Sequence, residues 1–249
     1  MCVIEFTIER WCALVPGLNT GDDWPRLTAG SLAVTGEKLI EKPELTGFPG
    51  MLRRRLSLVG KSAVHCLLAL HDPTDVRPDL PAIFCSQYGE VARSSKLLAS
   101  LAEEQPLSPT DFSLSVHNAV AGVYSIGCEQ TQNITVLSAG PNGFTYAILE
   151  AFSILKTSEH QQVACVVYDA QLPKPYPIEM NECDSPYALA FLISGNTKGA
   201  YIRASLDSEL GVGSLGIFDF LRFLKDPGAG PIQVQSGRSN WRYEHVGLD

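Results

Sequence analysis

The stretch NITVLSAGPNGFTYAILEAFSILKTSEHQQVACVVYDA, residues 133–170, decides the fold class. Its two ends, 133–139 and 161–170, are short apolar runs rich in β-branched residues, and both predict strands. Between them, the apolar residues of 143–156 recur at helical spacing and predict a helix. A strand, a helix and a second strand with short connections are typical of a parallel sheet covered by helices.

The segments on either side continue this α/β pattern along the chain. Apolar residues recur at helical spacing in 56–70, 90–102, 118–127 and 215–224. Strand-like runs occur at 2–15, 81–87, 187–194, 200–206 and 231–235. Residues 16–55 are rich in Gly and Pro and form a loop-rich excursion, with at most a short helix near 24–29. The sequence contains neither an internal repeat nor a clear linker, so we expect a single domain over residues 1–249.

The composition excludes several classes of protein. With 45% hydrophobic and 18% charged residues, the 249-residue chain is ordinary for a globular protein. A chain of this length buries roughly 70% of its unfolded surface without help from disulfides or a metal. The net charge of −8 argues against a general nucleic-acid binder. No apolar stretch approaches the roughly 18 residues that span a bilayer, and no signal peptide opens the chain. We therefore expect a cytoplasmic protein.

The sequence offers no framework for a disulfide, a metal or a cofactor. Its seven cysteines are odd in number and include no C-x-x-C pair, so we expect small buried thiols in a reducing compartment. The glycine-rich segment 211–214 lacks both the Walker lysine and the third Rossmann glycine. Asp169 and Asp184 do not form a recognisable carboxylate pair, and we expect both to be solvated loop acids. We therefore predict no cofactor and no bound metal.

The turn between the strand at 133–139 and the next helix is a candidate catalytic position. A sharp strand-to-helix turn places one residue above the sheet at the positive end of a helix, where enzymes hold a nucleophile and an oxyanion. Here the apex residue is Gly140, which has no side chain. Ser138 lies two residues earlier, and the segment does not match G-x-S-x-G. The pattern predicts the geometry for a nucleophile without the nucleophile itself.

A series of short motifs around this turn resembles the β-ketoacyl synthases of the thiolase superfamily. The motifs occur in the family's order: Arg53-Arg54-Arg55-Leu56-Ser57, Ser86-Gln87-Tyr88-Gly89-Glu90, Ser108-Pro109, Asn118-Ala119-Val120-Ala121-Gly122, Ser125-Ile126 and Ser138-Ala139-Gly140-Pro141-Asn142-Gly143. The resemblance covers most of residues 50–195, the N-terminal half of a ketosynthase. It implies an α/β half thiolase fold, in which helices cover a mixed, five-stranded sheet.

Departures from the family pattern determine the function that the resemblance implies. The family's nucleophilic cysteine maps onto Gly140, and none of the five histidines, at 65, 71, 117, 160 and 245, lies in a catalytic motif. Chain length factors, the inactive partners of ketosynthases, also lack the cysteine, although the glutamine they commonly carry there is absent here. The short length and residues 11–18 are similar to the truncated ketosynthase-like proteins that accompany a full ketosynthase in bacterial aryl polyene clusters.

The resemblance therefore implies a catalytically inactive subunit, a chain length factor. It would form a heterodimer or heterotetramer with an active β-ketoacyl-acyl carrier protein synthase in polyene or fatty-acid-type biosynthesis, and would meet the acyl carrier protein only indirectly. In thiolase-fold dimers the strand before the nucleophile pairs across the twofold axis. By this resemblance the partner interface contains Ile134, Val136, Ser138 and Asn118. The acyl pocket would be lined by Tyr88, Val91, Ser95 and Phe112.

Two alternatives remain open. The chain could be a small thiolase-like acyl hydrolase or transferase that acts alone through Ser138 or Cys128, although Cys128 has no histidine at a sequence-suggested distance. His117, beside Asn118, is expected to be a capping or core histidine rather than a base. The run Arg53–Arg55 could contact an acidic acyl carrier protein through charge steering, or could be an exposed helix cluster without a partner.

Overall fold

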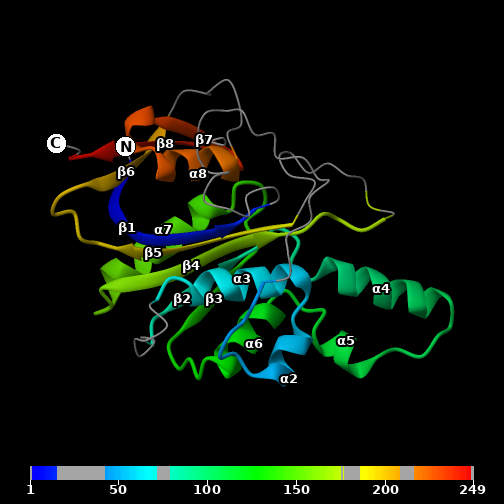
Figure 1. The fold of residues 1–249 in the computed structure, drawn as a ribbon. Helices are drawn as coiled ribbons and strands as arrows, with labels where there is room; N and C mark the ends of the chain where they lie inside the picture. The colour runs from blue at the N-terminus through cyan, green and yellow to red at the C-terminus, as the bar shows by residue number, and fades with distance from the viewer. Residues whose placement is uncertain are drawn as a thin grey trace.

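The computed structural model describes residues 2–15, 43–71, 79–174, 176, 186–207 and 216–247 (Figure 1). The short helix expected near 24–29, most of the loop-rich excursion and the segment 211–214 lie outside these residues. Within them, no helix combines the length and the apolar character needed to cross a bilayer.

One mixed sheet organises the molecule, with the strand order β3-β2-β4-β5-β1-β6-β8-β7. The strands are β1 (Val3–Leu14), β2 (Ala82–Cys85), β3 (Ile134–Leu137), β4 (Gln162–Asp169), β5 (Tyr187–Ser194), β6 (Tyr201–Asp207), β7 (Ile232–Ser236) and β8 (Ser239–Val246). Strand β2 is parallel to both of its neighbours, and every other pairing is antiparallel. The predicted strand-helix-strand unit with parallel strands is therefore confirmed.

Helices cover both faces of this sheet (Figure 1). They are α2 (Gly50–Arg55), α3 (Leu58–Leu68), α4 (Val91–Ala102), α5 (Pro109–Ser113), α6 (Ala119–Gly127), α7 (Phe144–Thr157) and α8 (Ile217–Lys225). Side chains of α3 and α6 pack on one face, and those of α7 and α8 on the other. Consecutive residues of β4 alternate between the two cores: Val163, Cys165 and Val167 face α7, whereas Ala164, Val166 and Tyr168 face α3. Burial on both faces explains the unbroken apolar run of this strand.

The sheet has eight strands among the described residues, and the strand-like runs of the sequence correspond to β1 through β7. The resemblance had implied a sheet of the five-stranded type. Strand β1 makes the extension possible because its first residues pair with β6 and the remainder pairs with β5. A register shift between Ile8 and Arg10 marks the irregularity in the pairing with β5. Strand β8 was missed by the sequence analysis, although Asn240 to Glu244 alternate between apolar and polar residues in the pattern of a half-exposed strand.

An aromatic cluster joins the added strands and α8 to α7. The rings of Phe144 and Phe220 stack with their centroids 4.4 Å apart, and Tyr243 lies edge-on to Phe220 at 5.6 Å. The Tyr243 hydroxyl donates a hydrogen bond to Oγ1 of Thr145 at 3.0 Å. The C-terminal part of the chain thus covers the face of α7 that points away from β2 and β4.

Removal of one ring from this cluster should measure its contribution to stability. Phe220 is fully buried, so Phe220→Ala is expected to lower the free energy of unfolding by about 3–5 kcal/mol. Phe112→Ala removes the same atoms at a position that is 66% exposed and should change the free energy by less than about 0.5 kcal/mol. Urea denaturation of the two variants checks this, and equal losses would show that the cluster does not anchor α8.

Candidate functional site

The predicted strand-to-helix turn follows β3, and Gly140 stands at its apex. Gly140 has a φ of +71°, in the left-handed region that glycine adopts easily. A Cβ built there would meet no described heavy atom within 4 Å. Helix α7 begins four residues later, at Phe144, so its N-terminal amide groups lie close to the turn. The turn therefore offers room for a nucleophile at a favourable electrostatic position, but the sequence supplies no side chain.

The turn is fastened to the C-terminal strand β7. The Asn142 side-chain amide donates to the carbonyl of Gln235 at 2.7 Å, and the Ser236 hydroxyl donates to the carbonyl of Asn142 at 3.0 Å. Gly143 is required for close packing, because a Cβ there would lie 2.8 Å from Sγ of Cys85. These contacts give the turn a structural role that joins β3, α7 and the last hairpin.

The residues that a stand-alone enzyme could use, Ser138, Cys128 and His117, lie in surroundings that differ from one another. Ser138 is exposed, and its hydroxyl donates to the carbonyl of Gln87 at 3.2 Å. Cys128 is half-buried at the end of α6. The His117 ring donates through Nε2 to the carbonyl of Ser86 at 2.9 Å, which agrees with its expected role as a structural histidine. These hydrogen bonds do not join His117 to Ser138 as a base to a nucleophile.

Strand β3, which contains two of the predicted interface residues, is at the edge of the sheet. Its inner side is identified by two hydrogen bonds: Ala82 N donates to the carbonyl of residue 133, and Ser86 N donates to that of Leu137. Since backbone groups alternate in direction along a strand, those of Ile134, Val136 and Ser138 point to the free edge. Asn118 is exposed at the start of α6. The structure thus places the predicted interface strand where it could accept another strand.

Helices α4 and α5 form an arm, residues 91–116, that projects from the body of the molecule (Figure 1). Helix α4 buries none of its residues in the chain's own core and packs mainly against α5. The arm exposes large apolar side chains, namely Leu98, Leu101, Leu107, Phe112 and Val116. Exposed apolar side chains gathered on one projection mark an interaction surface.

A polar network holds the root of this arm. Glu90 is buried, accepts a hydrogen bond from the Ser57 hydroxyl at 2.6 Å and pairs with Arg93 at 2.7 Å. Arg93 also reaches Asp111 at 3.1 Å and the carbonyl of Arg55 at 2.6 Å. A guanidinium presents several donors in a rigid fork, so Arg93 can tie α2, α4 and α5 together.

The predicted pocket residues all belong to the arm or its root. Tyr88 precedes α4 and accepts a hydrogen bond from the Gln87 side chain at 2.9 Å. Val91 and Ser95 are half-buried one turn apart on α4, whereas Phe112 on α5 is exposed. Their role as pocket residues remains a prediction.

The basic run at 53–55 divides between two surroundings. Arg53 and Arg54 line an open depression of about 600 Å³ together with Lys61. The backbone carbonyl of Arg55 instead accepts the hydrogen bond from Arg93 at the root of the arm. Among the described residues, no group of His, Cys, Asp and Glu side chains could hold a metal ion.

Asp169 is not the solvated loop acid that the sequence predicted, and Asp184, for which the same was expected, lies outside the described residues. Asp169 is the last residue of β4 and only 5% exposed. Its carboxylate accepts hydrogen bonds from the Ser86 hydroxyl at 2.7 Å, Gln87 N at 2.8 Å and Tyr88 N at 3.0 Å. Burial raises the pKa of this carboxyl above its usual range, and the three hydrogen bonds oppose the rise. The available signal was its position, since the parallel strands β2 and β4 end at the same edge of the sheet.

Comparisons with solved structures define the class of protein. A chain in the Xenorhabdus doucetiae complex of the ketosynthase ApeO with its chain length factor ApeC matches with a TM-score of 0.80 and 25% identity over 97% of this chain and 99% of that one. The ishigamide ketosynthase/chain length factor matches with a TM-score of 0.57 and 12% identity, over 82% of this chain and 68% of that one. A β-ketoacyl synthase from Burkholderia phymatum gives 0.55 and 11%, over 85% and 66%. The fold is thus the thiolase-like α/β fold of the ketosynthases.

The family follows from the sequence match. The family described as "Beta-ketoacyl synthase, N-terminal domain" matches residues 28–211. This chain therefore belongs to the β-ketoacyl synthase N-terminal domain family, as the motifs around Gly140 indicated. No protein in the curated collection matches the sequence.

The burial of the cysteines predicts a clear order of reactivity. Burial raises the pKa of Cys85 to about 12, whereas a hydrogen bond from Cys66 lowers the pKa of the less buried Cys12. Thiolates are the reactive form, so at pH 8 iodoacetamide should modify Cys12 at least about 100-fold faster than Cys85 in the folded chain. Peptide mass spectrometry measures the two rates. In urea the difference should vanish, and equal rates in the folded chain would contradict the buried placement of Cys85.

Proposed function

We propose that this chain is a non-catalytic, ketosynthase-like subunit that acts as a chain length factor for an active β-ketoacyl-acyl carrier protein synthase. The observation that carries the proposal is Gly140, which occupies the apex of the turn where the family holds its nucleophile. The match to a chain of nearly equal length in a ketosynthase–chain length factor complex supports the assignment. We further propose that residues 1–249 form one domain and that the complex works in the cytoplasm in polyene or fatty-acid-type biosynthesis.

Chemical inactivity follows from what a decarboxylative condensation needs. The reaction requires a nucleophile to hold the acyl chain, groups that promote decarboxylation and an oxyanion hole. Gly140 cannot form a thioester, and His117 is hydrogen-bonded to a backbone carbonyl. The partner ketosynthase would therefore supply the nucleophile and the histidines, and it would receive the acyl carrier protein.

The interface would form along the free edge of β3. Ile134, Val136 and Ser138 would pair through their outward backbone groups with the corresponding strand of the ketosynthase, and Asn118 would lie beside them. The exposed apolar arm would cover a second part of the partner. Edge strands and apolar projections are unfavourable in an isolated chain, so both features favour a permanent complex.

The pocket would be shaped by the arm and its root. Each methylene that an acyl chain buries contributes about 0.8 kcal/mol, until the chain meets a wall. Further growth then requires overpacking, which costs about 1–3 kcal/mol. Tyr88 and Phe112 are large enough to form such a wall, and Val91 and Ser95 would line the path towards it. The balance of these energies would stop elongation at a defined length.

The stand-alone enzyme remains the competing function because Ser138 is exposed beside the turn. An acyl hydrolase or transferase that uses Ser138 or Cys128 should be labelled by a serine- or thiol-directed acyl probe when the chain is alone. It should also lose turnover in Ser138→Ala or Cys128→Ala. If the chain is a non-catalytic subunit, we expect neither the labelling nor the loss of turnover. The probe should instead label the nucleophile of the partner ketosynthase.

The interface strand can be tested with one backbone donor. Val136→Pro removes an outward N–H and leaves the inner hydrogen bonds of β3 to β2 in place. We expect at least about tenfold weaker association with a co-expressed ketosynthase, as the loss of interface hydrogen bonds predicts. Val136→Thr keeps the N–H and the β-branched shape and should bind as the wild type does. Titration by light scattering or calorimetry measures both, and undiminished binding of Val136→Pro would remove β3 from the interface.

The pocket can be tested through product length. Tyr88→Ala and Phe112→Ala should lengthen the carrier-bound products by at least one two-carbon unit, because the wall recedes. Ser95→Trp should shorten them by filling the path. Leu206→Ala, on β6 and remote from the arm, is the control. Mass spectrometry of carrier-bound intermediates gives the distributions. Wild-type lengths in all three assembled variants would mean that α4 packs only within its own chain.

A further inference from the structure

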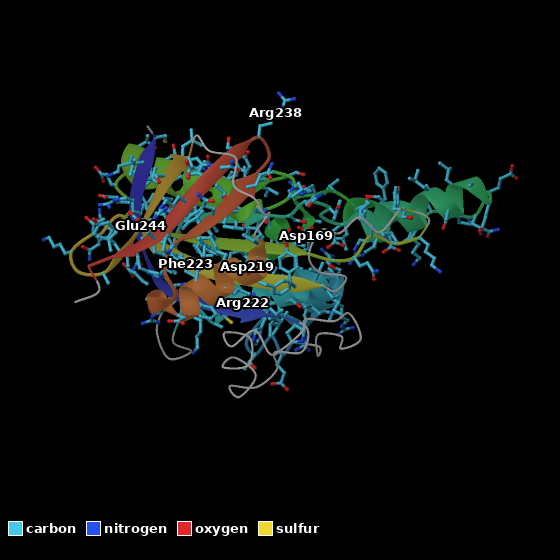
Figure 2. All side chains as sticks on the ribbon, turned by 90° about the horizontal axis from the view of Figure 1, so that it is seen from above. Asp169, Asp219, Arg222, Phe223, Arg238 and Glu244 are labelled. Carbon is cyan, nitrogen blue, oxygen red and sulfur yellow. The ribbon has the colours of Figure 1, made fainter. Side chains whose placement is uncertain are left out.

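The turn at the root of the arm, residues 86–89, is organised around one buried carboxylate. Three donors of this turn reach Asp169: the Ser86 hydroxyl, Gln87 N and Tyr88 N, at 2.7, 2.8 and 3.0 Å. The Ser86 hydroxyl oxygen in turn accepts from Gly89 N at 2.7 Å. Every residue of the turn is thus bound to Asp169 directly or through one hydroxyl. Figure 2 shows Asp169 on the side of the body from which the arm projects.

Closing this turn with Asp169 has an unfavourable desolvation free energy, because the carboxylate is buried. A buried carboxylate loses its hydration, which is why burial raises the pKa of Asp169. The same negative charge helps raise the pKa of the neighbouring Cys85 thiol. His117 opposes the shift electrostatically, and the Tyr187 hydroxyl lies 3.5 Å from the carboxylate. Water or a surface acid would satisfy the same amide groups, so stability alone does not explain a buried acid here.

The turn determines the direction of the arm. Gly89 has a φ of +55° and packs so closely on His117 that a Cβ would lie 2.7 Å from its ring. Two residues later α4 begins, and beyond Glu90 and Arg93 the arm is held mainly by α5. Helix α4 has 12 residues and is about 18 Å long, so a tilt of about 10° at its root moves the far end by about 3 Å.

We propose that Asp169 is a positioning residue for product length. It fixes the turn 86–89, and through this turn it sets where Tyr88 and the arm meet the partner ketosynthase. Of the predicted pocket residues, Tyr88 belongs to this turn, and Val91 and Ser95 lie in the first two turns of the helix that follows it. The inference rests on the proposed function, because it assumes that the arm shapes the acyl pocket.

The chain provides a matched control at the opposite end of the sheet. Asp79 also binds a turn with its carboxylate: it accepts from Thr131 N at 2.9 Å, from Gln132 N at 3.2 Å and from the Thr131 hydroxyl. Asp79 is exposed, and hydrogen bonds lower its pKa. Asp169→Asn and Asp79→Asn therefore make the same chemical change in two carboxylate-bound turns, only one of which carries the arm.

The first measurement is hydrogen exchange in the complex with the ketosynthase. In Asp169→Asn the amides of Gln87 and Tyr88 should exchange at least about tenfold faster, whereas the amide of Thr131 stays at the wild-type rate. Asp79→Asn should show the reverse. Should the asparagine variant fail to assemble, Ser86→Ala removes one donor and leaves the carboxylate in place. Unchanged exchange at Gln87 and Tyr88 in an assembled variant overturns the proposal.

The second measurement is product length. Asp169→Asn should broaden the distribution of carrier-bound products by at least one two-carbon unit, while Asp79→Asn gives the wild-type distribution. If Tyr88→Ala changes the products and an assembled Asp169→Asn does not, Asp169 is not a positioning residue. If Tyr88→Ala itself has no effect, the proposed pocket fails, and hydrogen exchange still decides whether Asp169 fixes the turn.

Discussion

Helix α7 has a broad apolar face that must be buried, whereas Ser153, Lys156 and Thr157 are exposed on its other side. Phe144, Ala147 and Ile148 are fully or almost fully buried. The sheet formed by β2, β4 and β5 can cover only part of this face. The rest is covered by α8 and by strands that continue the same sheet beyond β1. Part of this helix is thus buried by the C-terminal part of the same chain.

The C-terminal part of the chain also holds the turn that precedes α7. The strand that helps to cover the helix also hydrogen-bonds the turn through Gln235 and Ser236. The turn thereby joins the middle of the chain to its C-terminal hairpin. Gly140 at the apex adds no side chain to this joint. Within the described residues, β3 is an edge strand of the sheet and the arm exposes large apolar side chains.

The sequence allowed the central part of the fold to be predicted because its signals are local. Residues 133–170 carry the strand, helix and strand periods within one stretch, and Gly140 is identified by its place in that stretch. The environment of Asp169 could not be predicted in the same way. Its burial depends on donors about 80 positions earlier, which only the parallel pairing of β2 with β4 brings to it. Strand β8 had a local signal in its alternating residues, but Arg242 and Glu244 made it less apolar than the strands before it.

The carboxylates of Asp79 and Asp169 bind turns at opposite ends of the sheet, and their surroundings differ. In sheets with parallel strands, binding sites lie beyond the carboxyl ends of those strands. Asp79 lies at the other end, where β2 and β3 begin, and it closes a turn from solvent with a lowered pKa. Asp169 lies at the carboxyl end, where the free edge of β3, the turn at Gly140 and the root of the arm also meet. There the chain uses a buried acid with a raised pKa for the same task. An ionised carboxylate that is costly to bury gives its donors one defined arrangement, because any other arrangement leaves the charge unsatisfied. The difference between the two ends therefore favours a precise position, rather than stability, at the end of the sheet where the arm begins.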